Sequence, residues 1–303
     1  MLDVIYYPIS AVLWLWHTGF AALFGSASGV AWALAIVFLV LTLRGALYKP
    51  FMAQVKFQRT MSVLRPKMQE LQTKYADDRE RLTVEMRALQ KQHEFSVLSG
   101  CLPIFAQLVI FLGLFHVLSS FDRTGSGSLV VRLLGHPARM SAAQNAAVAN
   151  YVFSPAQVQS FLHAKLFTAP LSATLLTSGA DWVSVAAVAI PLVLVGAVCT
   201  HLTARASVSR QGEVTAQTRL INLMTMYLFP LGTLAAGLVM PVGILVYFAT
   251  SNTWTFAQQY MVHKRLGPID SAPGPDSDTA PKTSKSVGSL AKSVVNRSGL
   301  RRS

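Results

Sequence analysis

The sequence predicts an all-α polytopic membrane protein with five transmembrane helices, a cytoplasmic helical hairpin and a hydrophilic groove open to the cytosol. The chain is 52% hydrophobic, its mean hydropathy is +0.44, and 13% of its residues are charged, where a soluble domain carries about 25%. The apolar residues gather in segments long enough to cross about 30 Å of hydrocarbon, and the positive charges gather between those segments. These observations favour a membrane protein over a basic soluble domain despite the net charge of +13.

The N-terminal segment, residues 1–29, begins with apolar and aromatic residues and contains no lysine or arginine. A secretory signal peptide needs a basic region before its apolar core, so we do not assign one here. Tyrosine and tryptophan favour the membrane–water interface, and this segment contains Tyr6, Tyr7, Trp14 and Trp16. We therefore expect an extracytoplasmic helix that lies in the interface, with a true membrane span as the alternative.

Residues 30–48 form the first predicted span, and a strongly charged segment follows it. Ten basic and six acidic residues lie between positions 49 and 94. Apolar residues recur at helical spacing on both sides of Asp77 and Asp78, which mark a turn and the start of a second helix. Residues 49–98 are therefore predicted to form a helical hairpin in the cytoplasm, with a simple solvated connector as the alternative.

The central part of the chain contains two further predicted spans. Residues 99–118 form the second span, residues 119–180 an extracytoplasmic loop with a short helix around 155–167, and residues 181–201 the third span. Residues 202–219 are a polar cytoplasmic connector.

The stretch from Leu220 to Val262 contains no charged residue over 43 positions. As one helix it would be about 65 Å long, twice the hydrocarbon thickness, so it must form two spans. We place these spans at 220–236 and 242–262, with a turn between them and a kink at Pro230. The Pro-, Ser- and Lys-rich residues 263–303 are expected to form a disordered basic cytoplasmic tail.

The distribution of lysine and arginine predicts the orientation. Ten lie in the hairpin, three in the connector and eight in the tail, against four in the loop 119–180 and none in residues 1–29. Cytoplasmic loops carry the excess of positive charge. We therefore expect the N-terminus outside the cell and the C-terminus in the cytoplasm.

Polar residues within the predicted spans lie mainly in their cytoplasmic halves. Arg44 stands inside the first apolar run, where an arginine at the centre of a span costs about 2.5–3.5 kcal/mol. The spans contain no acidic partner for it, which favours a hydrated recess open to the cytoplasm. Alternatively, Arg44 snorkels to the headgroups, and the amides form ordinary interhelical hydrogen bonds. The other polar residues in these half-spans and near mid-membrane are Gln107, Asn222, Ser251, Asn252, Gln258 and Gln259.

The sequence contains no pattern that predicts an enzyme or a cofactor site. The spans have no paired carboxylates and no GxSxG or HExxH motif, the chain has no phosphate-binding GxxxxGK[ST] loop, and its two cysteines form no metal-ligand pattern. The alternative function is a small-solute transporter with Arg44 as an anion site. Transporters often show internal repeats and polarity on both sides of the membrane, and we see neither here.

Several short motifs, in order along the chain, resemble the YidC/Oxa1/Alb3 family of membrane protein insertases. They are VLTLRGALYKP at 40–50, LRPKMQ at 64–69, GCLP at 100–103 with Gln107, APL at 169–171, and PVG at 241–243 with Ser251, Asn252 and Gln258. The resemblance covers most of residues 1–265. The short outer N-terminus is similar to the Gram-positive, and especially the actinobacterial, branch.

The resemblance implies a function in protein transport at the bacterial plasma membrane. Family members insert nascent membrane proteins, alone or beside the Sec translocon, and act as chaperones for their folding. The implied partners are nascent membrane proteins, the Sec translocon, anionic lipids and, through the basic tail and cytoplasmic loops, the ribosome. The implied substrate-binding groove contains Arg44, Gln107, Tyr247, Phe248, Ser251, Asn252 and Gln258.

Overall fold

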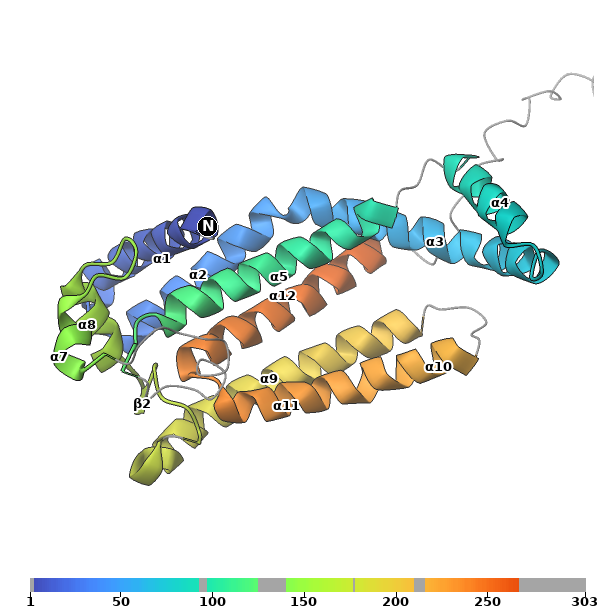
Figure 1. The fold of residues 1–303 in the computed structure, drawn as a ribbon. Coiled ribbons are helices and arrows are strands. Elements are labelled where there is room, and N and C mark those ends of the chain that lie inside the picture. The colour runs from blue at the N-terminus through green and yellow to red at the C-terminus, as the bar shows by residue number, and fades with distance from the viewer. Residues whose placement is uncertain (1–2, 93–96, 125–139, 177, 210–215, 267–303) are drawn as a thin grey trace, which may run out of the picture. The chain divides into compact units, whose positions relative to one another are not determined.

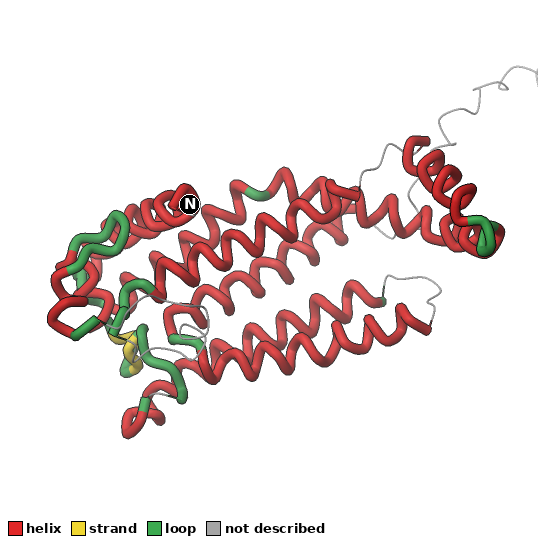
Figure 2. The backbone as a smooth tube through the Cα atoms, viewed as in Figure 1, coloured by secondary structure: helices red, strands yellow, loops and turns green. Residues whose placement is uncertain are grey.

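The described residues of the computed structural model are 3–92, 97–124, 140–176, 178–209 and 216–266. Helices make up most of this backbone, and a short strand pair lies in the connection between α5 (Val97–Ser119) and α9 (Trp182–Val208) (Figures 1 and 2). The tail predicted for residues 263–303 is outside the described residues from position 267 onward.

Helices α1 (Asp3–Phe24) and α2 (Gly29–Ala46) pack side by side and are joined by a tight turn (Figure 1). Gly25 in this turn has a φ of 90°, a left-handed conformation that glycine adopts without a steric penalty. The buried residues of α1 recur at spacings of three and four, so they form one face, which packs against α2 and α5. They are Ile9, Ser10, Leu13 and His17. α1 therefore lies against the helical bundle along one face.

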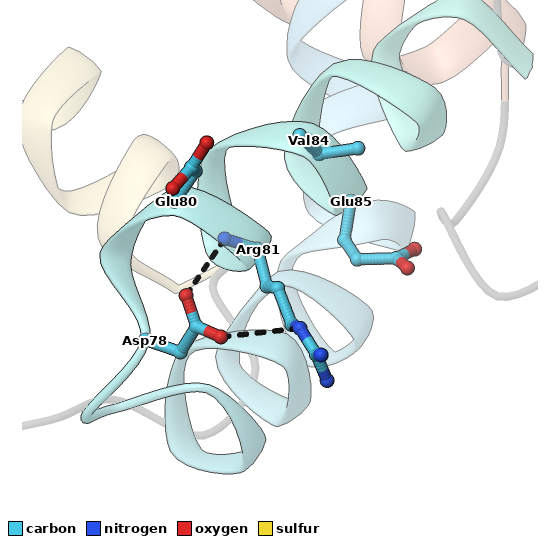
Figure 3. Close-up of a pocket in the computed structure, with 5 residues that line it drawn as sticks. All are labelled: Asp78, Glu80, Arg81, Val84 and Glu85. Atoms are coloured by element: carbon cyan, nitrogen blue, oxygen red, sulfur yellow. Dashed lines mark hydrogen bonds and ion pairs between the residues drawn. The ribbon is translucent and has the colours of Figure 1, made fainter.

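A helical hairpin follows α2 and consists of α3 (Tyr48–Lys74) and α4 (Arg79–Gln92). The turn between its helices contains the acidic pair at which the sequence predicted a break. Asp78 caps α4, because its Oδ1 accepts a hydrogen bond from the Arg81 backbone N–H at 3.0 Å (Figure 3). Its Oδ2 lies 3.2 Å from Arg81 Nε, an exposed ion pair that contributes little to stability.

Helix α5 (Val97–Ser119) packs against α1 and α3 and leads into the loop that precedes α9. The described part of this loop contains α7 (Ala142–Ala147), α8 (Pro155–His163), β1 (Lys165–Leu166), β2 (Ala169–Pro170) and the 3-10 turn η1 (Gly179–Asp181). Both α7 and α8 begin with a Ser-x-x-Gln capping box, in which serine and glutamine side chains satisfy two backbone N–H groups. Helix α8 lies where the sequence predicted a short helix.

The C-terminal half contains α9 (Trp182–Val208), α10 (Ala216–Leu223), the π-helical turn η2 (Met224–Leu228), α11 (Phe229–Val239) and α12 (Val242–Leu266). α9 packs against both α11 and α12, and α12 also packs against α2. By length and composition, three helical segments of the described residues could cross a membrane: 29–46, 179–208 and 218–239. The protein is thus an all-α membrane protein, and the two further spans, within α5 and α12, remain a prediction.

A cluster of buried aromatic rings surrounds Trp32 near the N-terminal end of α2. Trp32 is fully buried, and its ring stacks on His17 at a centroid distance of 3.6 Å. The rings of Phe121, Phe153 and Phe161 pack against it from the loop side. Trp32 stands 12 positions before Arg44, about 18 Å along a helix, so the aromatic cluster and the arginine lie toward opposite ends of α2.

Candidate functional site

Arg44 lies in the last turn of α2, and its side chain is half-buried. The helical repeat places Val40, Leu43 and Leu47 close to the same face of the chain. The last carbonyl groups of a helix carry partial negative charge, so an arginine in the final turn is favoured even without an acidic partner. Arg44 thus combines apolar neighbours with a favourable helix end.

The guanidinium of Arg44 contacts one face of α12. Its Nη2 lies 2.7 Å from Ser251 Oγ, 2.9 Å from Thr255 Oγ1 and 3.3 Å from the Ser251 carbonyl oxygen. Thr255 donates its own hydroxyl hydrogen to the same carbonyl at 2.9 Å, so it accepts from the arginine through a lone pair. Within the described residues no carboxylate pairs with Arg44, and neutral oxygens satisfy this nitrogen.

The sequence reasoning considered only acidic partners for Arg44, and the structure adds neutral ones. Its acceptors are two hydroxyls and a backbone carbonyl, contributed by residues 207 and 211 positions away. Hydroxyl and carbonyl oxygens are full hydrogen-bond acceptors for guanidinium, so a search for carboxylates alone misses them.

Tyr247 and Gln107 extend the polar contacts near Arg44. Gln107 Nε2 on α5 donates to the Tyr247 hydroxyl at 3.3 Å, and Tyr247 is only 3% exposed. Because Tyr247, Ser251 and Thr255 follow one another at four-residue intervals, they form a stripe along one face of α12. This stripe joins α12 to both α2 and α5.

A small cleft lies among α2, α5 and α12 at this point, with about 10 Å³ of free space, roughly the room that one water molecule needs. Its polar lining consists of Arg44, Gln107, Tyr247 and Ser251, and its apolar lining of Val40, Leu43, Leu47 and Ile110. Four of the seven residues predicted for the groove therefore line one cleft. The walls of this cleft carry hydrogen-bonding groups and one positive charge.

Phe248, Asn252 and Gln258 are not among the residues that line this cleft. Phe248 faces Gly196 of α9. The Asn252 amide accepts from Thr200 Oγ1 of α9 at 3.1 Å and donates to the Phe248 carbonyl at 2.8 Å. Gln258 is 4% exposed, and its Oε1 accepts from Trp254 Nε1 at 2.8 Å.

These predicted groove residues lie outside the cleft because successive residues of an α-helix point about 100° apart. Ser251 therefore faces α2, while its neighbour Asn252 faces α9. Adjacent polar residues in a span need not belong to one site.

Thr255 is a site residue that the sequence reasoning missed. The signal that could have found it is the four-residue spacing from Tyr247 through Ser251 to Thr255. The described residues contain no group of three or more His, Cys, Asp or Glu side chains that could hold a metal ion.

Comparison with known proteins identifies the family to which the chain belongs. A family model described as 60Kd inner membrane protein matches residues 23–268. A Mycolicibacterium paratuberculosis protein named membrane protein insertase YidC is 42% identical over 281 residues, which cover 89% of this chain and 78% of that protein. A Mycobacterium leprae protein of the same name is 41% identical over 281 residues, with 89% and 72% covered.

A more distant relative, from Streptomyces avermitilis and also named membrane protein insertase YidC, is 31% identical over 264 residues, covering 84% of this chain and 56% of that protein. These matches confirm the resemblance drawn from the short motifs, including its actinobacterial character. Together with the apolar helices they identify a multi-pass protein of a bacterial membrane. The chain belongs to the 60Kd inner membrane protein family, the family of the YidC insertases.

Proposed function

We propose that this chain is a membrane protein insertase, which inserts nascent membrane proteins and assists their folding, alone or beside the Sec translocon. The observation that carries the proposal is the half-buried Arg44 in the cleft among α2, α5 and α12, in a chain whose relatives are named insertases. A charge kept at this position is costly in a membrane and is usually functional.

The proposed mechanism follows from the cost of moving polar chain segments through hydrocarbon. A hydrated groove that opens toward the cytoplasm shortens the low-dielectric path that a substrate's translocated segment must cross. Arg44 attracts acidic residues of that segment, while its apolar stretches partition into lipid. Lipid partitioning and the membrane potential supply the driving force, so the proposal needs no nucleotide or other cofactor.

The remaining parts of the proposal concern topology and partners. Five spans place the N-terminus outside and the C-terminus in the cytoplasm, following the lysine and arginine distribution. The hairpin α3–α4 then lies in the cytoplasm, where it receives nascent chains. The basic tail and cytoplasmic loops contact ribosomes or anionic lipids.

The direct test replaces Arg44 and follows insertion of model substrates whose translocated segments are acidic or neutral. We expect Arg44→Ala to reduce insertion of the acidic substrates most and Arg44→Lys to retain part of it, because lysine keeps the charge and loses the planar donor geometry. Insertion is measured by protease protection of the translocated segment in reconstituted vesicles.

The matched control is Asn252→Ala, which removes a polar side chain at a neighbouring depth that faces α9 instead of the cleft. This variant should affect acidic and neutral substrates equally. Normal insertion of every acidic substrate by Arg44→Ala would contradict the role of the charge. Specific solute uptake by the reconstituted protein, without insertion, would favour the transporter instead.

A further inference from the structure

The helical segment that begins at α10 and ends with α11 is interrupted in its middle. Residues 224–228 form the π-helical turn η2, in which the Phe229 N–H donates to the Met224 carbonyl five residues earlier. Wide turns of this kind inside an α-helix are rare and occur often at functional sites. The interruption lies inside the candidate span Thr218–Val239.

Pro230 closely follows this turn and removes one backbone donor from the helix. In a regular α-helix the N–H of residue 230 would donate to the carbonyl of Met226, four positions earlier. Proline has no N–H, so Pro230 cannot make this bond. A carbonyl left without a donor is especially costly in a membrane, where water cannot replace the missing partner.

His201 of α9 supplies a donor to that same carbonyl. Its Nδ1 lies 3.1 Å from the Met226 oxygen, and because a carbonyl can only accept, Nδ1 must carry the hydrogen. The imidazole also lies beside the Tyr227 ring, with a centroid distance of 6.1 Å. This carbonyl therefore has a side-chain donor from the neighbouring helix.

A second feature of this turn favours bending. The hydroxyl of Thr225 donates to the Ile221 carbonyl at 2.8 Å, a bond to the preceding turn that often bends helices. α9 packs against η2 and α11, whereas the large apolar side chains of α10 and η2 are largely exposed. Loss of a contact to α9 would thus free this segment more than it would disturb the rest of the bundle.

We propose that η2 is a hinge in this membrane helix and that His201 is the positioning residue that holds it against α9. While the imidazole donates its hydrogen bond to the Met226 carbonyl, α10 is held in one orientation relative to α11. When the bond opens, α10 swings away from α9. The proposal concerns the distance between α9 and α10, so it can be tested without measuring insertion activity.

The test is a double-mutant cycle between His201 and Pro230 in the full-length protein reconstituted in lipid. Spin labels are placed on exposed cysteines at Arg205 of α9 and Leu220 of α10, in a background without native cysteines. We expect His201→Phe, which keeps a ring but no donor, to broaden and lengthen the measured distance distribution. His201→Asn, which restores an N–H near the same place, should return it toward that of the parent protein.

The second variant of the cycle is Pro230→Ala. Alanine has a backbone N–H, which can donate to the Met226 carbonyl in a regular α-helix. In this background His201→Phe should leave the distance distribution narrow. An unchanged distribution in His201→Phe alone would overturn the role of His201. Equal broadening with and without Pro230→Ala would show that the imidazole acts on something other than this carbonyl.

Discussion

A comparison of Thr255 with Thr250 can measure how much the hydrogen bond from Arg44 to one hydroxyl contributes to stability. Both threonines donate to the carbonyl four residues earlier, at 2.9 and 2.8 Å, but only Thr255 also accepts from Arg44. We expect Thr255→Val to reduce the free energy of unfolding by about 1 kcal/mol more than Thr250→Val, since a hydrogen bond to a charged group is lost. Reversible unfolding in mixed micelles measures both variants. Equal destabilisation would show that the Arg44 contact contributes nothing.

Tyr151 of the loop between α5 and α9 should ionise at unusually high pH. Its hydroxyl lies 2.7 Å from His116 Nε2, and burial, with smaller contributions from Tyr6 and Asp3, raises its pKa above the ordinary 10.0. Because the folded protein holds this proton more tightly than the unfolded chain, the contribution to stability is present below pH 10 and is lost as the pH rises through the folded pKa.

The measurement is the alkaline absorbance difference between the parent protein and Tyr151→Phe. We expect the titration of the missing tyrosinate to have its midpoint above pH 10.0. A midpoint at or below that value would contradict the burial of this hydroxyl in solution.

At the scale of elements, the contact between α2 and the strand β1 depends on the absence of a side chain at Gly29. A Cβ atom built there would overlap the carbonyl and amide groups of Lys165 and Leu166, whereas one built at Gly19 of α1 would meet nothing within 4 Å. We expect Gly29→Ala to destabilise the protein by about 1–3 kcal/mol through overpacking against backbone. Thermal unfolding in detergent measures the change.

The matched control is Gly19→Ala, which places the same methyl group on an exposed face of a helix. Alanine is favoured over glycine inside a helix by about 0.5–1 kcal/mol, so this variant should be neutral or slightly stabilising. A tolerated Gly29→Ala, with an unchanged unfolding temperature, would mean that the loop carrying β1 is free to move away from α2.

For the whole molecule, the predicted orientation and the hydrated groove can be tested together with single cysteines and a membrane-impermeant thiol reagent. We expect cysteines at Thr83 of α4 and at position 44 to react from the cytoplasmic side, and one at Thr168, between β1 and β2, from the outside. Thr83 and Thr168 are both exposed in the structure, so a difference between them reports the side of the membrane.

Three outcomes at position 44 are informative. Reactivity from the cytoplasm alone would support the groove proposed for the insertase. Protection from both sides would place Arg44 in lipid or in a dry core and would remove the main physical support for that mechanism. Reactivity from both sides would favour a transporter.

The membrane class of the protein and several breaks in its backbone could be predicted from the amino-acid sequence alone. The break near Asp78 and the interruption before Pro230 lie where the acidic pair and the proline predicted a change of structure. These features depend on composition, caps and prolines within a single turn or segment, so they can be recognised without knowing the neighbours. The family resemblance was equally local, since it rested on short motifs in order.

Which polar residues contact one another could not be predicted before the fold was known. Arg44 and Thr255 are 211 positions apart, and no periodicity within either helix predicts that they share a hydrogen bond. Asn252 and Ser251 are adjacent in sequence, yet they contact different helices. Hydropathy assigns residues to a membrane span, but the rotation of that span about its axis depends on packing against its neighbours. This rotation placed Ser251 and Thr255, and not Asn252, beside the arginine.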